Sequence, residues 1–258
     1  MWLFGRGSNL LVSDQGLPGV TLVTTNLKEL AWSIGLPSEI GNDLDGGSVR
    51  LRVGAGYSLA KLAQEAGERG LSGLEFARGI PGTVGGAIIM NAGAHGQEIG
   101  ERVVWVKALV DGELRELTAS ECNFGYRESS LKDKAWVLEA ELELFPGERE
   151  EILLRMQENL RKRAATQPLE WPNAGSVFRN PPGDFAARLI EEAGWKGKSC
   201  GAAKVSEKHS NFIINTGGAR AADVLFLIRA IRADVYERFG IELQPEIQYL
   251  GTELEARL

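Results

Sequence analysis

The stretch "GIPGTVGGAIIMNAGAHG", residues 79–96, constrains the fold of this chain more than any other segment. It holds six glycines in 18 residues, whereas the chain's 32 glycines in 258 residues would supply about two. Glycine lets the backbone adopt positive φ and lets another group approach where a Cβ would collide. Apolar residues stand between the glycines, as is unusual in a linker: Ile80, Val84, Ile88, Ile89 and Met90. The pattern favours a folded binding loop, with a tight structural turn as the alternative.

Length and charge set the broad class of the protein. A chain of 258 residues can bury a substantial core in one large domain or in two to three lobes. Its 29 basic and 35 acidic residues give a net charge of -6, which offers no basic surface for nucleic acid or an anionic membrane. No stretch approaches the roughly 20 apolar residues of a membrane span. We expect a cytoplasmic protein with no nucleic-acid partner and no membrane insertion.

The cysteines and histidines argue against a metal site. Cys122 and Cys200 lie far apart, in no metal or redox spacing, and are expected to be free thiols in a reducing compartment. His95 and His209 lack partners at ligand spacing. We therefore predict no bound metal.

Hydrophobic periodicity predicts an α+β arrangement. Strands are expected at 19–24, 48–53, 103–110, 113–118 and 136–144, with an Asp-Gly turn between the third and the fourth. A helix is expected from an N-cap at Ser58 to a stop at Gly70, with an apolar face of Leu59, Leu62, Ala63 and Ala66.

Composition changes at "FPGEREE", where Pro146 and Gly147 interrupt the strand pattern, and we place the main domain boundary between 148 and 149. Beyond it, helices are expected from Ile152, at 185–193, and from Val224 to Gly240. Strands are expected at 212–215 and over 241–250, where Pro245 suggests an edge or a bulge.

The N-terminal "FGRGSNLLV" is a second candidate cradle for an anion. It is not the dinucleotide-binding fingerprint, because Leu10 stands where that motif needs its third glycine. Alone it fits an ordinary turn, but with the loop at 79–96 it favours an extended diphosphate ligand. The candidate contacts are Gly5, Gly7, Ser8 and Asn9.

Three polar segments carry further candidates, each with an ordinary structural interpretation as well. "FGYRESS" contains Arg127, "PNAGSVFRNPPG" contains Ser176, and "LQPEIQYL" places Glu246 at an inward phase of the last expected strand. Taken singly, Arg127 fits a surface ion pair, Ser176 a loop hydroxyl and Glu246 a solvated carboxylate. Both interpretations stay open at this point.

Together the segments resemble one family over almost the whole chain. Seven motifs stand in the order found in MurB-type UDP-N-acetylenolpyruvoylglucosamine reductases: "GRGSNLLV", "GLEFARGIPGTVGGAIIMNAGAHG", "FGYRESS", "RAATQP", "NAGSVFRNP", "VSEKHSNFIIN" and "PEIQYLG". Any one motif would be weak, but chance agreement of seven ordered motifs is negligible. The short stretch between Arg127 and Ser176 resembles the shorter class of the family, which lacks an inserted tyrosine-bearing loop.

The resemblance implies an α+β fold. A two-lobed FAD-binding domain of the vanillyl-alcohol-oxidase-like (PCMH) type would span 1–148, with lobes at 1–57 and 58–148. A C-terminal α+β substrate-binding domain would span 149–258, with its last strand returning to the flavin site.

The implied activity is NADPH-dependent reduction of UDP-N-acetylglucosamine enolpyruvate to UDP-N-acetylmuramate, a step of peptidoglycan synthesis that serves the cell wall, cell shape and cell division. FAD would be bound non-covalently, NADPH would be the co-substrate, and the enzyme would be a monomer. Two alternatives stay open: an FAD-linked oxidase on the same scaffold, and a flavin-free protein that only binds a nucleotide sugar.

Roles for single residues also follow from the resemblance. Ser176 resembles the proton donor, and Arg127 and Glu246 resemble the pair that polarises the substrate. Contacts with the nucleotide sugar are implied for Tyr126, Arg163, Asn180 and His209. Contacts with FAD are implied for the "GRGSN" residues Gly5, Gly7, Ser8 and Asn9 and for Gly79, Ile80, Pro81, Gly82, Gly85, Gly86, Asn91 and Gly93.

Two features depart from the family pattern. The family usually has a further N-terminal segment before the "GSN" loop, whereas this sequence starts almost at the loop. We expect either a misassigned start or an incomplete first lobe, which would weaken FAD binding. Gln248 stands where many relatives place an arginine, and a neutral side chain there is expected to stabilise reduced flavin less.

Overall fold

The computed structural model describes residues 1–32 and 47–251. The parts of the expected domains that fall on 33–46 and 252–258 lie outside the described residues. The chain divides into two compact units. Unit 1 comprises Met1–Arg6 and Thr21–Arg163, and unit 2 comprises Gly7–Val20 and Ala164–Leu258.

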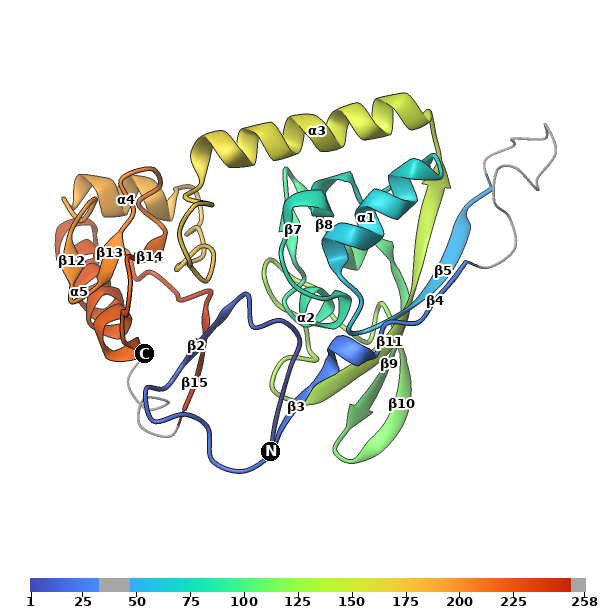
Figure 1. The fold of residues 1–258 in the computed structure, drawn as a ribbon, viewed down its shortest axis with the longest axis horizontal. Helices are drawn as coiled ribbons and strands as arrows, with labels where there is room; N and C mark the ends of the chain where they lie inside the picture. Colours follow the sequence, from blue (N-terminus) through green and yellow to red (C-terminus); the bar gives the residue numbers. More distant parts are fainter. Residues whose placement is uncertain (33–46, 252–258) are drawn as a thin grey trace. The chain divides into compact units, whose positions relative to one another are not determined.

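Unit 1 is built on an antiparallel sheet with the strand order β10-β9-β11-β5-β4 (Figure 1). The strands are β4 Leu30–Trp32, β5 Val49–Gly54, β9 Val103–Val110, β10 Glu113–Thr118 and β11 Ala135–Pro146. A short strand, β6 Leu71–Ser72, pairs with the end of β11. Asp111 (φ 51°) and Gly112 (φ 84°) form the tight turn between β9 and β10 that the Asp-Gly pair predicts.

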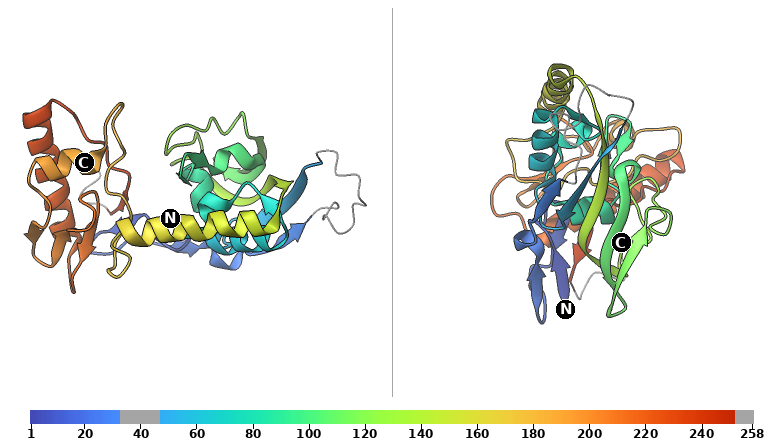
Figure 2. Two further views of the ribbon diagram at one scale, coloured as in Figure 1. Left: turned by 90° about the horizontal axis from the view of Figure 1, so that it is seen from above. Right: turned by 90° about the vertical axis from the view of Figure 1, so that its right-hand side faces the viewer.

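Alternating burial along β5 shows that one face of the sheet is covered. Val49, Leu51 and Val53 are fully buried, whereas Arg50 and Arg52 are exposed and form ion pairs with Glu141 of β11. The helices on the covered face are α1 Leu59–Glu68, the 3-10 helix η2 Glu75–Gly79 and α2 Val84–Ile89 (Figures 1 and 2).

Helix α1 confirms the prediction made for it from periodicity. The four residues of its expected apolar face are fully buried. Ser58 is the N-cap residue, but its side chain makes no capping hydrogen bond. Gly70, at φ 71°, follows the end of the helix.

Unit 1 has further short elements among its described residues. Strands β1 Trp2–Phe4 and β3 Thr21–Val23 pair in parallel, and β7 Gly93–Ala94 pairs antiparallel with β8 Gln97–Glu98. The remaining 3-10 helices are η1 Thr24–Asn26 and η3 Ile99–Arg102. The strand expected at 19–24 is therefore shorter than predicted, because the chain turns into η1 at Thr24.

Helix α3, Arg149–Thr166, packs with unit 1. Its buried residues Ile152 and Met156 belong to the core of that unit, where Met156 lies close against Gly67 of α1. By packing, unit 1 thus extends to Arg163. The division into an FAD-binding domain at 1–148 and a substrate-binding domain at 149–258 stays a prediction.

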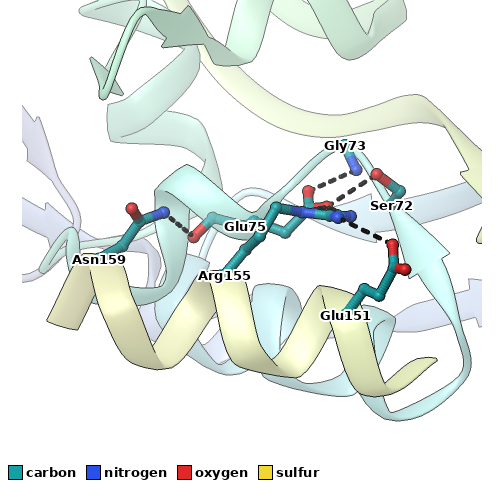
Figure 3. A network of polar contacts seen from close by, with 6 residues as sticks. All are labelled: Ser72, Gly73, Glu75, Glu151, Arg155 and Asn159. Carbon is teal, nitrogen blue, oxygen red and sulfur yellow. Dashed lines mark hydrogen bonds and ion pairs between the residues drawn. The ribbon is translucent and has the colours of Figure 1, made fainter. Parts of the chain in front are cut away.

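A buried carboxylate fastens α3 to η2 (Figure 3). Glu75 is only 5% exposed, and it accepts hydrogen bonds from Ser72 Oγ at 2.7 Å, the Gly73 N–H at 2.7 Å and Arg155 Nη2 at 2.8 Å. Asn159 of α3 also donates to the Glu75 carbonyl, at 3.4 Å. Burial by itself would raise the pKa of Glu75, but the hydrogen bonds from Arg155, Gly73 and Ser72 outweigh it and hold that pKa below its usual value.

Unit 2 has a three-stranded antiparallel sheet that shares a core with two helices. The sheet consists of β12 Ser199–Cys200, β13 Ala203–Val205 and β14 Ile213–Asn215, and the helices are α4 Ala186–Glu192 and α5 Ala221–Phe239. The Asp14 carboxylate accepts the N–H groups of Ala221 at 2.7 Å and Ala222 at 3.0 Å, so it caps the N-terminus of α5. Gly240, in the left-handed region, ends α5 as predicted.

The single strand expected over 241–250 is wrong for most of its length. Only β15, Gln248–Leu250, forms, and it pairs in parallel with β2, Leu10–Val12. Pro245 makes an isolated bridge with Phe178, and proline cannot donate to a continuous ladder. Leu243 and Ile247 enter the core, while Glu246 stays half-buried, which corrects its expected inward phase.

We expect Glu75→Gln to destabilise the protein by about 1–3 kcal/mol at pH 7, the size of hydrogen bonds to a buried charge. The pKa of Glu75 is lower in the folded protein than in the unfolded chain. The ionised carboxylate therefore contributes its full stabilisation above the pKa of the unfolded chain, and this contribution is lost as the pH falls through the pKa of the folded protein. Urea unfolding of parent and variant should therefore give a difference that shrinks between pH 7 and pH 3. The exposed Glu150→Gln, on α3, serves as the control. Equal losses in both variants, constant with pH, would contradict this account.

Candidate active site

The glycine-rich segment forms the end of η2, a turn and the whole of α2. Ile80 is extended after η2, and Gly82 has φ 116°, a conformation that side chains rarely adopt. Thr83 is the N-cap of α2, and its Oγ1 accepts the Gly86 N–H at 3.4 Å. The segment is thus a folded loop that contains a short helix.

Two close approaches fix this loop in unit 1. A Cβ at Gly85 would lie 2.8 Å from the Cβ of Ala55, whose carbonyl accepts the Gly85 N–H at 2.8 Å. A Cβ at Gly5 would lie 2.9 Å from Cγ2 of Thr83. The first of the "GRGSN" residues therefore packs directly on the N-cap of α2, whereas Gly7, Ser8 and Asn9 belong to unit 2.

Part of the loop backbone is not covered by protein. Pro81 and Gly86 are exposed. A Cβ at Gly86 would meet only Thr83 Oγ1, at 3.6 Å. The loop thus presents main chain at Pro81 and Gly86, whereas Thr83, Val84 and Gly85 between them are buried. Such a surface suits a flat group that must approach the backbone closely.

Asn91, a candidate cofactor contact, has its side chain engaged by the protein. It is only 2% exposed, at φ 41°. Its Nδ2 donates to Glu98 Oε2 at 2.7 Å and to the Gly125 carbonyl at 2.9 Å, and its Oδ1 accepts the Gly100 N–H at 2.9 Å. The structure therefore gives this side chain a role in holding three segments together.

Arg127 lies beside this network. Its backbone is left-handed, at φ 58°, and its side chain is 18% exposed. Nη2 donates to the Gly93 carbonyl at 2.6 Å, Nη1 pairs with Glu98 Oε1 at 3.3 Å, and the guanidinium lies 5.0 Å from the centre of the Tyr126 ring. Arg127 and Tyr126 were candidates from the sequence, whereas Glu98 was not.

A second cation lies at the start of the loop. The Arg163 side chain crosses Gly79, where an added Cβ would lie 3.0 Å from Arg163 Cδ. Burial lowers the pKa of Arg163, although a guanidinium stays protonated at physiological pH. Burial, followed by the charges of Lys162 and Arg163, also lowers the pKa of His95, so that its imidazole is neutral at pH 7.

In unit 2, Ser176 and Glu246 come from neighbouring segments. The Glu246 N–H donates to the Val177 carbonyl at 2.8 Å, and the Val177 N–H donates to the Asn211 carbonyl at 2.8 Å. Gly175, at φ 84°, makes the turn just before Ser176. The segments that carry Ser176 and Glu246 are thus joined although they lie far apart in the sequence.

Asn211 was missed by the sequence analysis. It is 3% exposed, its Oδ1 accepts the Phe178 N–H at 2.9 Å, and its Nδ2 donates to the Phe178 carbonyl at 2.8 Å. The amide replaces a strand partner and fixes the segment that carries Ser176. The available signal was an asparagine standing between a polar loop and a strand in "KHSNFIIN".

The remaining candidates of unit 2 also have protein partners. Asn180 Oδ1 accepts the Ala186 N–H at 3.1 Å, at the start of α4. His209 Nδ1 accepts the Asn211 N–H at 3.3 Å, and burial lowers the pKa of His209, so the ring is neutral at pH 7. Asn9 Nδ2 donates to the Glu246 carbonyl at 3.1 Å.

Gln248 is held in the same way. Its N–H donates to the Asn9 carbonyl at 2.8 Å, and its Nε2 donates to the Glu246 carbonyl at 2.8 Å. Asn9 and Gln248 therefore both support the main chain at Glu246.

Within residues 1–32 and 47–251, no group of three or more His, Cys, Asp or Glu side chains could hold a metal ion. No helix in these ranges is long and apolar enough to cross a membrane. Cys122 and Cys200 are free thiols, as expected, and burial raises the pKa of Cys122 to about 11.

Comparison with known proteins gives the class of the protein. Residues 1–118 match the model of an FAD-binding domain, and residues 167–250 match the model described as "UDP-N-acetylenolpyruvoylglucosamine reductase, C-terminal domain". The chain is a flavoprotein, an FAD-dependent oxidoreductase with an α+β fold.

Individual relatives give the family. UDP-N-acetylenolpyruvoylglucosamine reductase 2 of Symbiobacterium thermophilum is 46% identical over 97% of this chain and 78% of its own length. Reductase 1 of Bacillus anthracis is 48% identical over 96% of this chain and 79% of its own length. The crystal structure of the reductase (MurB) from Thermus caldophilus matches with a TM-score of 0.79 and 40% identity, over 96% of this chain and 85% of that one. The chain belongs to the UDP-N-acetylenolpyruvoylglucosamine reductase family.

The glycine loop fits the FAD that this class binds. The main chain is exposed at Pro81 and Gly86, and Gly86 is a position where an added Cβ would fill the space above the backbone.

We expect Gly82→Val to weaken FAD binding at least about tenfold. The variant strains the backbone and keeps the cofactor from approaching it closely, and the two effects together should cost more than the about 1 kcal/mol of a change in backbone propensity. Gly112→Val, at φ 84° in the turn between β9 and β10, imposes similar strain away from the loop. It should lower the melting temperature but leave FAD affinity unchanged in a fluorescence titration. Parent-like affinity in Gly82→Val would show that Gly82 serves only the turn.

Proposed function

We propose that this chain reduces UDP-N-acetylglucosamine enolpyruvate to UDP-N-acetylmuramate with NADPH as co-substrate, using Ser176, Arg127 and Glu246. The family's function is this reduction in peptidoglycan precursor synthesis. The observation that carries the residue assignment is the hydrogen bond between the Glu246 N–H and the Val177 carbonyl, which joins the Ser176 and Glu246 segments. The relatives named above are reductases, which favours this function over that of an oxidase.

The FAD-binding role is assigned to residues 1–148. When bound, FAD supplies hydride transfer. The loop backbone at residues 79–86, together with Gly5 and Gly93, would hold it non-covalently. Gly7, Ser8 and Asn9 would add N–H groups and a hydroxyl. Asn91 acts mainly through the hydrogen bonds that shape the loop.

Arg127 stabilises charge on the substrate. Addition of a hydride to one carbon of the enolpyruvyl double bond leaves negative charge on the other carbon and its carboxylate. A guanidinium that is already fixed in place stabilises this charge without reorganising during the reaction. The bonds of Arg127 to Gly93 and Glu98 support this role, because they fix the guanidinium before substrate arrives.

Ser176 gives a proton to the carbon that carries the negative charge. A serine hydroxyl is a weak acid in water, but it can protonate a strongly basic carbanion when it is held within hydrogen-bond reach. The turn at Gly175 and the Asn211 contacts hold the serine segment rigidly. Glu246 shares with Arg127 the task of polarising the substrate.

The nucleotide sugar is assigned to residues 149–258 with help from Tyr126. Arg163 supplies a partly buried cation that suits a phosphate, and Asn180 and the neutral His209 supply polar contacts. We further propose that the enzyme works as a monomer in the cytoplasm, where NADPH and nucleotide sugars are available.

Ser176→Ala should separate the two half-reactions. Flavin reduction by NADPH should stay within about twofold of the parent, because Arg127, Glu246 and the glycine loop are intact. Reoxidation by the enolpyruvyl substrate should slow by roughly 10²–10⁴-fold, the contribution of a positioned acid. Stopped-flow absorbance at the flavin band follows each half-reaction. The exposed Ser199→Ala is the matched control in unit 2. Equal slowing of both halves in Ser176→Ala would remove the assignment of Ser176 as proton donor.

A further inference from the structure

Glu98 stands at the point where the glycine-rich segment meets the turn that carries Arg127. Strands β7 and β8 form a hairpin in which Glu98 pairs directly with Gly93. Its two turn residues, His95 and Gly96, have φ angles of 54° and 81°. This tight turn fixes the register, so the Glu98 side chain starts from a defined place beside the Gly93 carbonyl.

The guanidinium of Arg127 docks on this residue pair. Nη2 donates to the Gly93 carbonyl at 2.6 Å, and Nη1 donates to Glu98 Oε1 at 3.3 Å. The side chain of Glu98 reaches Nη1 by crossing Gly93, where an added Cβ would lie 2.7 Å from Glu98 Cγ and 3.1 Å from Arg127 Nη1. Gly93 is therefore required for this ion pair, whatever else it contacts.

The second oxygen of Glu98 is used as well. Oε2 accepts from Asn91 Nδ2 at 2.7 Å, and the same amide donates to the Gly125 carbonyl at 2.9 Å. Gly125 and Glu128 exchange backbone hydrogen bonds across the turn that contains Arg127. The Glu98 carboxylate thus binds the Arg127 guanidinium directly. Through Asn91, the same carboxylate is also linked to the backbone of the turn that carries Arg127.

We propose that Glu98 is a positioning residue that holds Arg127 in its reactive orientation, an inference that rests on the role proposed above for Arg127. Only a carboxylate offers two acceptor oxygens, one for a guanidinium and one for an amide N–H. Glutamine has the same shape, but its NH₂ group replaces one of the two oxygens and would face a donor, either Arg127 Nη1 or Asn91 Nδ2. Arg127 also keeps a left-handed backbone, which a non-glycine residue retains only when its surroundings over-determine it.

The test uses Glu98→Gln, Arg127→Ala and the double variant in the full FAD-loaded enzyme. Reoxidation by the enolpyruvyl substrate should slow about 10- to 100-fold in Glu98→Gln, the size of a lost charge-assisted hydrogen bond. Flavin reduction by NADPH and FAD affinity should stay within about twofold. In the Arg127→Ala background, Glu98→Gln should have no further effect, because there is no guanidinium left to position.

Glu101→Gln is the matched control. Glu101 lies three residues further along the chain, is exposed, and pairs only with its neighbour Arg102 among the interactions described. All rates of this variant should equal those of the parent.

The outcomes separate this inference from the proposed function. If Arg127→Ala slows reoxidation but Glu98→Gln does not, or if the two effects add in the double variant, Glu98 does not position Arg127. If Arg127→Ala leaves reoxidation unchanged, the role of Arg127 itself is wrong and both proposals fall. Should Glu98→Gln lose FAD, the same cycle is run with Glu98→Asp, whose shorter side chain keeps the charge but cannot reach both partners. The slowing is again expected to vanish without Arg127.

Discussion

The contact between Gly85 and Ala55 determines where the glycine-rich loop lies. A backbone hydrogen bond and the absence of a Cβ let α2 approach the turn after β5 more closely than any other residue would permit. Gly5 packs on Thr83 at the same helix end, so two segments distant in sequence converge there. Pro81 and Gly86, where the backbone is exposed, lie on either side of Thr83 and Gly85 in the sequence, and the hairpin that carries Glu98 follows along the chain. The proposed FAD contacts and the residues that bind Arg127 therefore depend on the tightly packed N-terminus of α2.

The two units contribute different parts of the proposed chemistry. Unit 1 carries Arg127, held by a carbonyl and a carboxylate, together with the glycine loop. Unit 2 carries Ser176 and Glu246 on hydrogen-bonded segments. Each unit contains a buried asparagine whose amide forms hydrogen bonds within the protein: Asn91 binds the Glu98 side chain and the Gly125 carbonyl, and Asn211 binds the main chain of Phe178. Buried amides whose hydrogen bonds are all satisfied make the segments that they join rigid.

Local signals in the sequence predicted local structure well. The Asp-Gly pair and the alternation on both sides of it predicted β9 and β10, and the apolar spacing predicted α1. The expected strand over 241–250 failed because Pro245 interrupts the ladder. The positioning roles of Glu98 and Asn211 could not be found from pattern alone, because Arg127 and Phe178 lie 29 and 33 residues away from them in the sequence. The family resemblance supplied candidate residues, whereas only the hydrogen bonds revealed what positions them.

Non-covalent binding of FAD to this chain is the central claim, and an absorption spectrum tests it most directly. The purified protein, titrated with FAD and freed of excess cofactor, should show a flavin band that saturates at one FAD per chain. Acid precipitation should then leave the yellow flavin in the supernatant. A protein that takes up no FAD, or a flavin that stays with the precipitate, would contradict the account.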